Sequence, residues 1–244
     1  MNFLLYDGTF EGFLTLVYDV YHHKYHVKAI AKKMSDCLEF DDIYTIVTDV
    51  DKAHKVLTAL RNKFSKEHVN TIIHIFLCDT KMFECNLLTF IILGFKANEN
   101  LKNINYPSVF YIRELEKEYL RLTHRMYGFV RFEELEDKTL YAKVETKFNI
   151  LMFLGEHFSK RLGNNAFIIH DIQRKIAYVH DENTQEIRSV DSFDSPLYSY
   201  DETKFKNLWK TFFNAVAIEN RRNQKLQKSL VPLIYRTYMS EFQP

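Results

Sequence analysis

The chain has 244 residues and a formal net charge of +1, and 46% of its residues are hydrophobic. This composition supports a large core, and the presence of only 6 glycines and 4 prolines argues against long disordered linkers. A net charge near zero excludes a global electrostatic field that would attract nucleic acid or membranes, so any such attraction must be local.

The cysteines and the apolar runs indicate the cellular compartment in which the protein is expected. Cys37, Cys78 and Cys85 are too few and too scattered for a disulfide framework, which favours a reducing compartment. The N-terminus lacks the basic segment and the long apolar stretch of a signal peptide. The longest apolar run, residues 87–95, is shorter than the roughly 20 residues that span a bilayer. We therefore expect a cytoplasmic protein that does not bind membranes.

The chain opens with a strand, a turn and a helix. Residues 3–6 form a short apolar strand, Asp7 and Gly8 make the turn, and Thr9 can cap a helix over residues 10–22. The start of such a helix can bind an anion, although an ordinary corner between strand and helix explains the same residues.

Two pairs of possible metal ligands occur in the N-terminal half. His22 and His26 are four residues apart, but no third ligand follows at a matching spacing. Cys78 and Cys85 match no standard metal site and are expected in the core. We therefore expect no metal site and no cofactor.

The rest of this half is predicted to be mainly helical. Residues 27–42 are mixed and partly irregular, and residues 44–48 alternate as a second strand. Asp49 or Asp51 caps a helix that runs to about Phe64. Further helical segments cover residues 71–77, 82–95 and a long helix that begins at Pro107 and ends at Gly128, in a left-handed cap. Residues 1–127 thus form a mainly helical region with one or two short strands.

After Gly128 the hydrophobic period changes from 3.6 to 2, which indicates strands. Two hairpins and a fifth strand are expected around one helix. Their predicted ranges are 129–135 with 139–145, the helix 149–162, 166–173 with 176–181, and 186–191. This order, ββαβββ, predicts an antiparallel sheet with a helix on one face, and hence an α+β fold. Residues 128–244 form the second region, and tight packing into a single domain stays an alternative.

The C-terminal tail returns to helix and is locally basic. A helix is predicted over residues 202–219, and eight basic residues but only one acid, Glu219, lie between Lys204 and Arg236. Arginine forks and asparagine amides suit phosphates and base edges. The candidate nucleic-acid contacts in the tail are Arg221, Arg222, Asn223 and Lys225. The alternative is a solvated helix in which one buried arginine holds Glu219.

One face of the first hairpin is a second candidate for binding. It carries Phe129, Arg131, Tyr141 and Lys143, and aromatic rings beside cations can stack bases and contact phosphates. The alternative is a solvated sheet face on which Arg131 pairs with Glu133 and Lys143 pairs with Glu145 across the strands.

His170 and Asp171 are the candidates for catalysis, together with His124. Neighbouring residues on a strand point to opposite faces, so His170 and Asp171 are not expected to form a hydrogen-bonded dyad. His124 or His180 could instead join His170. A histidine that is held by one partner inside the fold is the structural alternative.

Three parts of the chain carry a family resemblance: residues 6–21, the two central stretches 124–145 and 166–181, and residues 208–241. They resemble a bacterial family associated with DNA repair or DNA metabolism, whose C-terminal half is a domain of unknown function also found fused to uracil-DNA-glycosylase-like proteins. The resemblance is carried by Tyr6, Asp7, Gly8, Thr9, Glu11, Gly12, His124, Arg125, Gly128, Phe129, Arg131, Phe132, His170, Asp171, Trp209, Ile218, Arg221, Asn223, Leu226, Gln227 and Pro232.

The resemblance implies a role in DNA repair and a partner, a radical-SAM protein with a helix-hairpin-helix motif. The chain is not itself such an enzyme, because it lacks the CxxxCxxC cluster motif. Arg125 joins the candidate nucleic-acid contacts as one of the matching positions. The chain departs from the family pattern at two places. Leu233 and Ile234 replace a Lys-Arg pair near the end, which weakens the case for nucleic-acid binding by the last helix. Lys147 and Phe148 replace an Asp-His pair, so a catalytic role of that pair does not carry over.

Three functions follow as hypotheses. The first is an accessory protein that binds DNA and works with the radical-SAM partner. The second is an enzyme acting on nucleic acid, a hydrolase or a glycosylase-like protein. The third is a docking protein for the partner, without contact to nucleic acid. The oligomeric state is left open.

Overall fold

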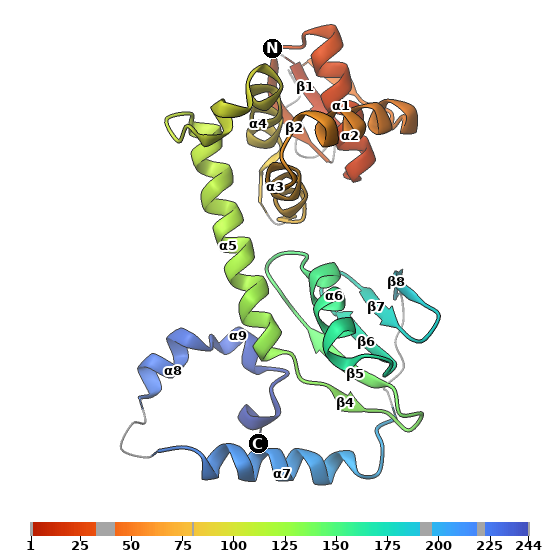
Figure 1. The fold of residues 1–244 in the computed structure, drawn as a ribbon, viewed down its shortest axis with the longest axis vertical. Coiled ribbons are helices and arrows are strands. Elements are labelled where there is room, and N and C mark those ends of the chain that lie inside the picture. Colours follow the sequence, from red (N-terminus) through yellow and green to blue (C-terminus); the bar gives the residue numbers. More distant parts are fainter. Residues whose placement is uncertain (1, 33–41, 80, 191–196, 219–222, 244) are drawn as a thin grey trace. The chain divides into compact units, whose positions relative to one another are not determined.

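A computed structural model describes residues 2–32, 42–79, 81–190, 197–218 and 223–243. The chain divides into two compact units, Met1–Leu120 and Arg121–Pro244, and the boundary falls inside helix α5 (Pro107–Phe129). Both units combine helices with a sheet, which confirms the predicted α+β class (Figure 1).

The first unit contains a three-stranded parallel sheet of order β2-β1-β3. Its strands are β1 (Asn2–Leu5), β2 (Val27–Ala31) and β3 (Asp42–Thr45). Of residues 27–42, which were predicted to be mixed and partly irregular, residues 27–31 form β2, and residues 33–41 lie outside the described part of the chain. This strand is stabilised by hydrogen bonds to β1, across the helix that connects the two, and its five residues alone do not reveal that pairing.

Helices surround this sheet. They are α1 (Phe10–His23), α2 (Val50–Lys63), α3 (Lys66–Phe76), α4 (Glu84–Lys96), the 3-10 helix η2 (Asn98–Lys102) and the first part of α5. The predicted caps Thr9 and Asp49 are confirmed, since their side chains accept hydrogen bonds from the amides of Gly12 and Lys52. Fully buried rings such as Phe13, Phe83 and Phe90 fill the core.

The long helix α5 has an apolar stripe at spacings of three and four residues, and Val109, Ile112 and Tyr119 on this stripe are fully buried. The predicted end at Gly128 was wrong, because the helix runs to Phe129. The amide of Val130 bonds to the carbonyl of Met126, which continues the helical pattern, and Gly128 does not adopt a positive φ. No left-handed cap is formed there.

The second unit contains a five-stranded sheet of order β4-β5-β6-β7-β8. Its strands are β4 (Glu133–Glu134), β5 (Leu140–Val144), β6 (Phe167–Asp171), β7 (Ile176–His180) and β8 (Gln185–Ser189), with helix α6 (Leu151–Leu162) after β5. The predicted order ββαβββ is confirmed. One pairing departs from the expected antiparallel pattern: β5 and β6 are parallel, because α6 crosses over the sheet between them.

Helix α6 covers one face of this sheet. Its buried residues include Leu154 and Phe158, and Gly155 lies so close to Tyr178 of β7 that a Cβ atom there would be 2.3 Å from the ring. Tyr178 pairs across the sheet with Ile169, which pairs in turn with Ala142. Directly paired residues share a face, so Ala142 marks the α6 face, and its neighbours on β5 point the other way.

The tail consists of short helices. They are α7 (Glu202–Ala215), α8 (Gln224–Leu230), α9 (Leu233–Arg236) and the 3-10 helix η4 (Ser240–Phe242). The carboxylate of Glu202 accepts a hydrogen bond from the amide of Glu134, which ties the start of α7 to β4. The rings of Phe213 and Phe242 meet edge to face and hold α7 against η4. The predicted helix over 202–219 is therefore confirmed as far as Ala215.

Candidate functional site

A pocket of about 320 Å³ opens on the face of the second sheet opposite α6. Tyr141 and Lys143 of β5 form one wall, α7 forms a second, and the C-terminal segment forms a third. We call it the basic pocket. Its lining residues are Arg131, Glu133, Tyr141, Lys143, Tyr198, Lys206, Lys210, Thr237, Tyr238, Ser240 and Gln243.

Cations and aromatic rings alternate around the basic pocket. Lys143 lies over the ring of Tyr141, with its Nζ atom 5.8 Å from the ring centre, and Lys206 lies over Tyr198 at 4.9 Å. Lys206 also pairs with Glu133 at 2.5 Å. Of the four lining cations, Arg131 is paired with Glu241 and Lys206 with Glu133, so the excess of positive charge in the pocket comes from Lys143 and Lys210.

Arg131 serves as a clamp for the C-terminal segment. Its guanidinium donates two hydrogen bonds to the carboxylate of Glu241, at 3.2 and 2.6 Å, and further bonds to the carbonyls of Gly128 and Val130. Glu241 also accepts a bond from the indole of Trp209 at 3.1 Å. Burial acts to raise the pKa of Glu241, but the bonds from Arg131 and Trp209 outweigh it and lower the pKa. Arg131 therefore fixes a wall of the pocket.

The tyrosines of the basic pocket stay protonated. Burial, helped by the nearby charge of Glu133, raises the pKa of Tyr141 and of Tyr198. Burial and Glu145 raise the pKa of Tyr238 in the same way. Tyr141 is buried and bonded to His170, whereas Tyr198 and Tyr238 are partly exposed and can offer a ligand an aromatic face.

Tyr141 connects the pocket to His170. The phenol oxygen lies 2.9 Å from Nδ1 of His170, on the neighbouring strand β6. Burial lowers the pKa of His170, opposed by Asp171 and aided by Lys143, so the ring is neutral near pH 7. In the neutral ring, an unprotonated Nδ1 can accept the hydrogen bond that the hydroxyl of Tyr141 donates.

Asp171 points away from His170 and holds a turn. Its carboxylate accepts hydrogen bonds from the amide and the guanidinium of Arg174, at 3.1 and 2.9 Å, and Arg174 also bonds to the carbonyls of Thr146 and Lys147. The expectation that His170 and Asp171 do not form a dyad is met by this geometry.

The other histidine and arginine candidates lie elsewhere. His180 is bonded to Ser159 and to the carbonyl of Gly163, on the α6 side of the sheet, so it does not join His170. His124 and Arg125 are exposed on α5 and are not among the residues that line the basic pocket.

The candidates in the tail are only partly visible. Arg221 and Arg222 lie outside the described residues. Asn223 caps α8, since its side chain accepts a hydrogen bond from the amide of Leu226 at 2.9 Å, and Lys225 is exposed on the same helix. The binding roles of these four residues stay predictions.

Sequence reasoning found one side of the basic pocket and missed the other. Arg131, Tyr141 and Lys143 were expected to share a face, but the contribution of α7 was not foreseen. Lys206 and Lys210 are four residues apart on a helix, and that spacing places them on one side. Glu241 carried no local signal, because it lies 110 residues from Arg131.

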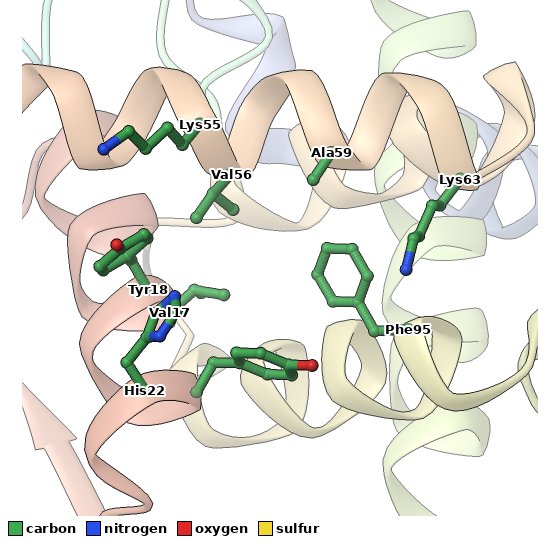
Figure 2. A pocket seen from close by; sticks show the side chains of 9 residues that line it. Val17, Tyr18, His22, Lys55, Val56, Ala59, Lys63 and Phe95 are labelled. Carbon is green, nitrogen blue, oxygen red and sulfur yellow. The ribbon is translucent and has the colours of Figure 1, made fainter.

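A second pocket, of about 260 Å³, lies in the first unit between α1, α2 and α4. Figure 2 shows Val56, Ala59 and Phe95 around its interior, with Lys55 and Lys63 on either side. Its lining is mostly apolar and aromatic, which suits a flat apolar group but defines no reaction.

The corner between β1 and α1 is closed by the chain itself. The carboxylate of Asp7 accepts hydrogen bonds from the amide and the hydroxyl of Thr9, and from the hydroxyl of Thr48 at 2.6 Å. Burial acts to raise the pKa of Asp7, but these bonds together lower it. An internal carboxylate thus occupies the place where an external anion was considered, as in an ordinary corner.

The described ranges hold no group of three or more His, Cys, Asp or Glu side chains placed to bind a metal ion. In the same ranges, no helix has both the length and the apolar composition required to cross a bilayer.

Comparison with known families gives one match. Residues 81–241, more than half of the chain, match the model of a domain of unknown function, DUF4130. This range includes all the lining residues of the basic pocket except Gln243. No curated protein matches the chain.

Proposed function

The chain belongs to the DUF4130 domain family, and we propose that it binds nucleic acid through the basic pocket of its second unit. The observation that carries this proposal is the convergence of four cations and three tyrosines on one cavity from β5, α7 and the C-terminal segment. Cations neutralise phosphates, and aromatic rings stack on bases of any sequence.

The size of the cavity favours unpaired nucleotides. A volume of about 320 Å³ lies at the lower end of ligand-sized pockets. A base that is free to leave its stack can reach the partly exposed rings of Tyr198 and Tyr238, whereas a base within a duplex cannot. Lys143 and Lys210 would contact the backbone phosphates of such a strand, and Arg131 would hold the wall in place.

The wider role that we propose is in DNA repair or DNA metabolism, in the cytoplasm and beside a radical-SAM protein with a helix-hairpin-helix motif. It is supported by the family resemblance of the central and C-terminal segments. Arg221, Arg222, Asn223 and Lys225 would extend the contact along the strand, and Arg125 is kept as a further candidate.

Binding of a fluorescent oligo-dT strand at several salt concentrations tests this function. Lys143→Ala and Lys210→Ala should each weaken binding and lower the salt slope by roughly 0.7 for the lost phosphate contact. The matched control is Lys160→Ala, which removes an exposed lysine from α6, on the other face of the sheet. It should leave both affinity and slope unchanged.

The tail is tested separately in the same assay. Replacing Arg221, Arg222 and Lys225 together by alanine should weaken binding to all sequences and lower the slope further. If the unmodified chain shows no salt-sensitive binding to DNA or RNA, the proposed function is wrong and the partner-docking hypothesis is favoured.

The bonded pair of Tyr141 and His170 favours a second candidate, an enzyme acting on nucleic acid. Tyr141 could take a proton from a water molecule while its own proton passes to Nδ1 of His170. Cleavage or base release from a damaged duplex, lost in His170→Ala and in Tyr141→Phe, would support it. Failure to detect either reaction with the unmodified chain would count against it.

A further inference from the structure

Helix α7 exposes its apolar side. Phe205, Leu208, Trp209, Phe212 and Val216 follow one another at spacings of one, three and four residues, which places them on one side of the helix. The exposed fraction is 38% for Trp209 and 56–57% for the other four. We call these five residues the outer stripe of α7. An exposed apolar surface of this extent marks an interaction site.

A groove lies at each end of the outer stripe. The first has a volume of about 630 Å³, and Phe205 and Trp209 line it together with Phe158 and Leu162. The second has about 420 Å³, and Val216 lines it with residues of α8 such as Leu226. The stripe from Phe205 to Val216 is about 16 Å long, at 1.5 Å per residue. Its length and the two grooves match about three turns of an added helix.

The charges beside this surface are mainly positive. Two acids, Glu134 and Glu202, also line the first groove, but Glu134 is paired with Lys138 and Glu202 is buried. Arg161 lines the first groove, Lys204 lies on α7, and Lys225 and Lys228 lie on α8. Between residues 204 and 236, the described positions include six basic side chains and no acidic one. A ligand that fits this surface therefore needs an apolar stripe with acidic residues along its flanks.

We infer that the outer stripe of α7 binds an acidic amphipathic helix of a partner protein. A nucleic acid would satisfy the cations but would leave Leu208 and Val216 without apolar contacts. A second copy of the chain would bring the same positive charges face to face. A membrane surface is flat and would not fill the two grooves, whereas a helix laid along α7 fills them.

This surface adjoins the basic pocket. The first groove shares Arg131, Lys206 and Ser240 with the pocket, whereas Leu208 and Phe212 are not among the residues that line it. One helix thus carries a cationic side toward the proposed nucleic-acid site and an apolar side toward the partner. The inference does not depend on the proposed function, because Leu208 and Phe212, which its test changes, do not line the basic pocket.

Binding of a fluorescent synthetic peptide to the full chain tests the inference. The peptide would be a helix of about four turns with leucines at one side and glutamates at the flanks. Leu208→Ala with Phe212→Ala should weaken its binding about tenfold or more. The matched control, Asn207→Ala with Thr211→Ala, changes two exposed residues of α7 beside the stripe and should leave the affinity unchanged.

Four results would overturn the inference. The first is no binding of the acidic peptide, or equal binding of a version with lysine in place of every glutamate. The second is a dimer of the chain in light scattering that dissociates in Leu208→Ala with Phe212→Ala. The third is binding to vesicles with anionic lipids that the same double variant abolishes. The fourth is displacement of the peptide by oligo-dT through the stripe residues.

Discussion

Helices α6 and α7 belong to the same unit and have similar amphipathic patterns, but they use their apolar sides differently. α6 packs Leu151, Leu154 and Phe158 onto the sheet, whereas the only buried residue of α7 is Glu202. Figure 1 shows α6 crossing the sheet, while α7 runs beside the C-terminal segment. α6 connects the parallel strands β5 and β6, so both of its ends are held at the sheet. The comparison shows that periodicity predicts an apolar side but not what covers it.

The largest expected effect comes from a matched pair of substitutions in these helices. Leu154→Ala removes a fully buried side chain and should lower the free energy of unfolding by about 2–5 kcal/mol. Leu208→Ala removes an exposed one and should change it by less than about 0.5 kcal/mol. Urea unfolding measures both. A loss of similar size in the two variants would contradict the description of Leu208 as exposed on the outer side of α7.

The next effect concerns what does hold α7 and the C-terminal segment in place. Arg131→Ala leaves the carboxylate of Glu241, whose side chain is 2% exposed, without its main partner. The free energy of unfolding should fall by about 2–4 kcal/mol at pH 7. Urea unfolding with limited proteolysis of the C-terminal segment measures it, and an unchanged stability would show that the clamp contributes nothing.

The pH dependence of the clamp follows from the lowered pKa of Glu241. A carboxyl whose folded pKa lies below its ordinary value contributes its full stability above that ordinary value, 4.5, and loses it as the pH falls through the folded pKa. The difference between the unmodified chain and Arg131→Ala should therefore shrink below about pH 4.5. Arg131→Lys, which keeps the charge but loses the forked geometry, should lie between the two.

A smaller effect is expected at the contact of α6 with the sheet. Gly155→Ala places a Cβ atom 2.3 Å from the ring of Tyr178, so the helix or the ring must shift. The strain should exceed the gain in helix propensity and lower the free energy of unfolding by roughly 1–2 kcal/mol. Thermal unfolding measures it. A stabilised variant would show that α6 is free to move away from the sheet.

The smallest effect concerns the bond between the two candidate catalytic groups. Tyr141→Phe removes the donor to His170 and should lower the free energy of unfolding by about 1 kcal/mol at pH 7.5, as urea unfolding can measure. Because burial lowers the folded pKa of His170, its contribution is full above 6.5 and declines as the pH falls below that value. NMR titration of the ring should give a pKa below 6.5, and a value above it would contradict the buried, neutral form.

Local structure was largely predictable from the sequence, and long-range contacts were not. The stripe of α5, the cap at Thr9 and the order ββαβββ follow from periods and turn residues within short windows. Strand β2, the parallel pairing of β5 with β6 and the bond between Arg131 and Glu241 depend on partners far away in the chain. No local pattern carries that information.

The candidate site divides in the same way. Because side chains alternate between the two faces of a strand, the sequence predicts Tyr141 and Lys143 on one face of β5. The same rule predicts that the neighbours His170 and Asp171 point to opposite faces of β6. The inclusion of Lys206 in the same pocket required the position of α7, which is set by Glu202 and the C-terminal segment. A site that is built from three distant segments therefore cannot be predicted without the tertiary structure.

The most direct test of nucleic-acid binding at the basic pocket is an NMR titration of the full chain with oligo-dT. Signals from the rings of Tyr141, Tyr198 and Tyr238 and from the side chains of Lys143 and Lys210 should shift with a common affinity, while those of Leu208 and Phe212 should not. Shifts confined to the outer stripe of α7, with an unperturbed pocket, would contradict the proposed function.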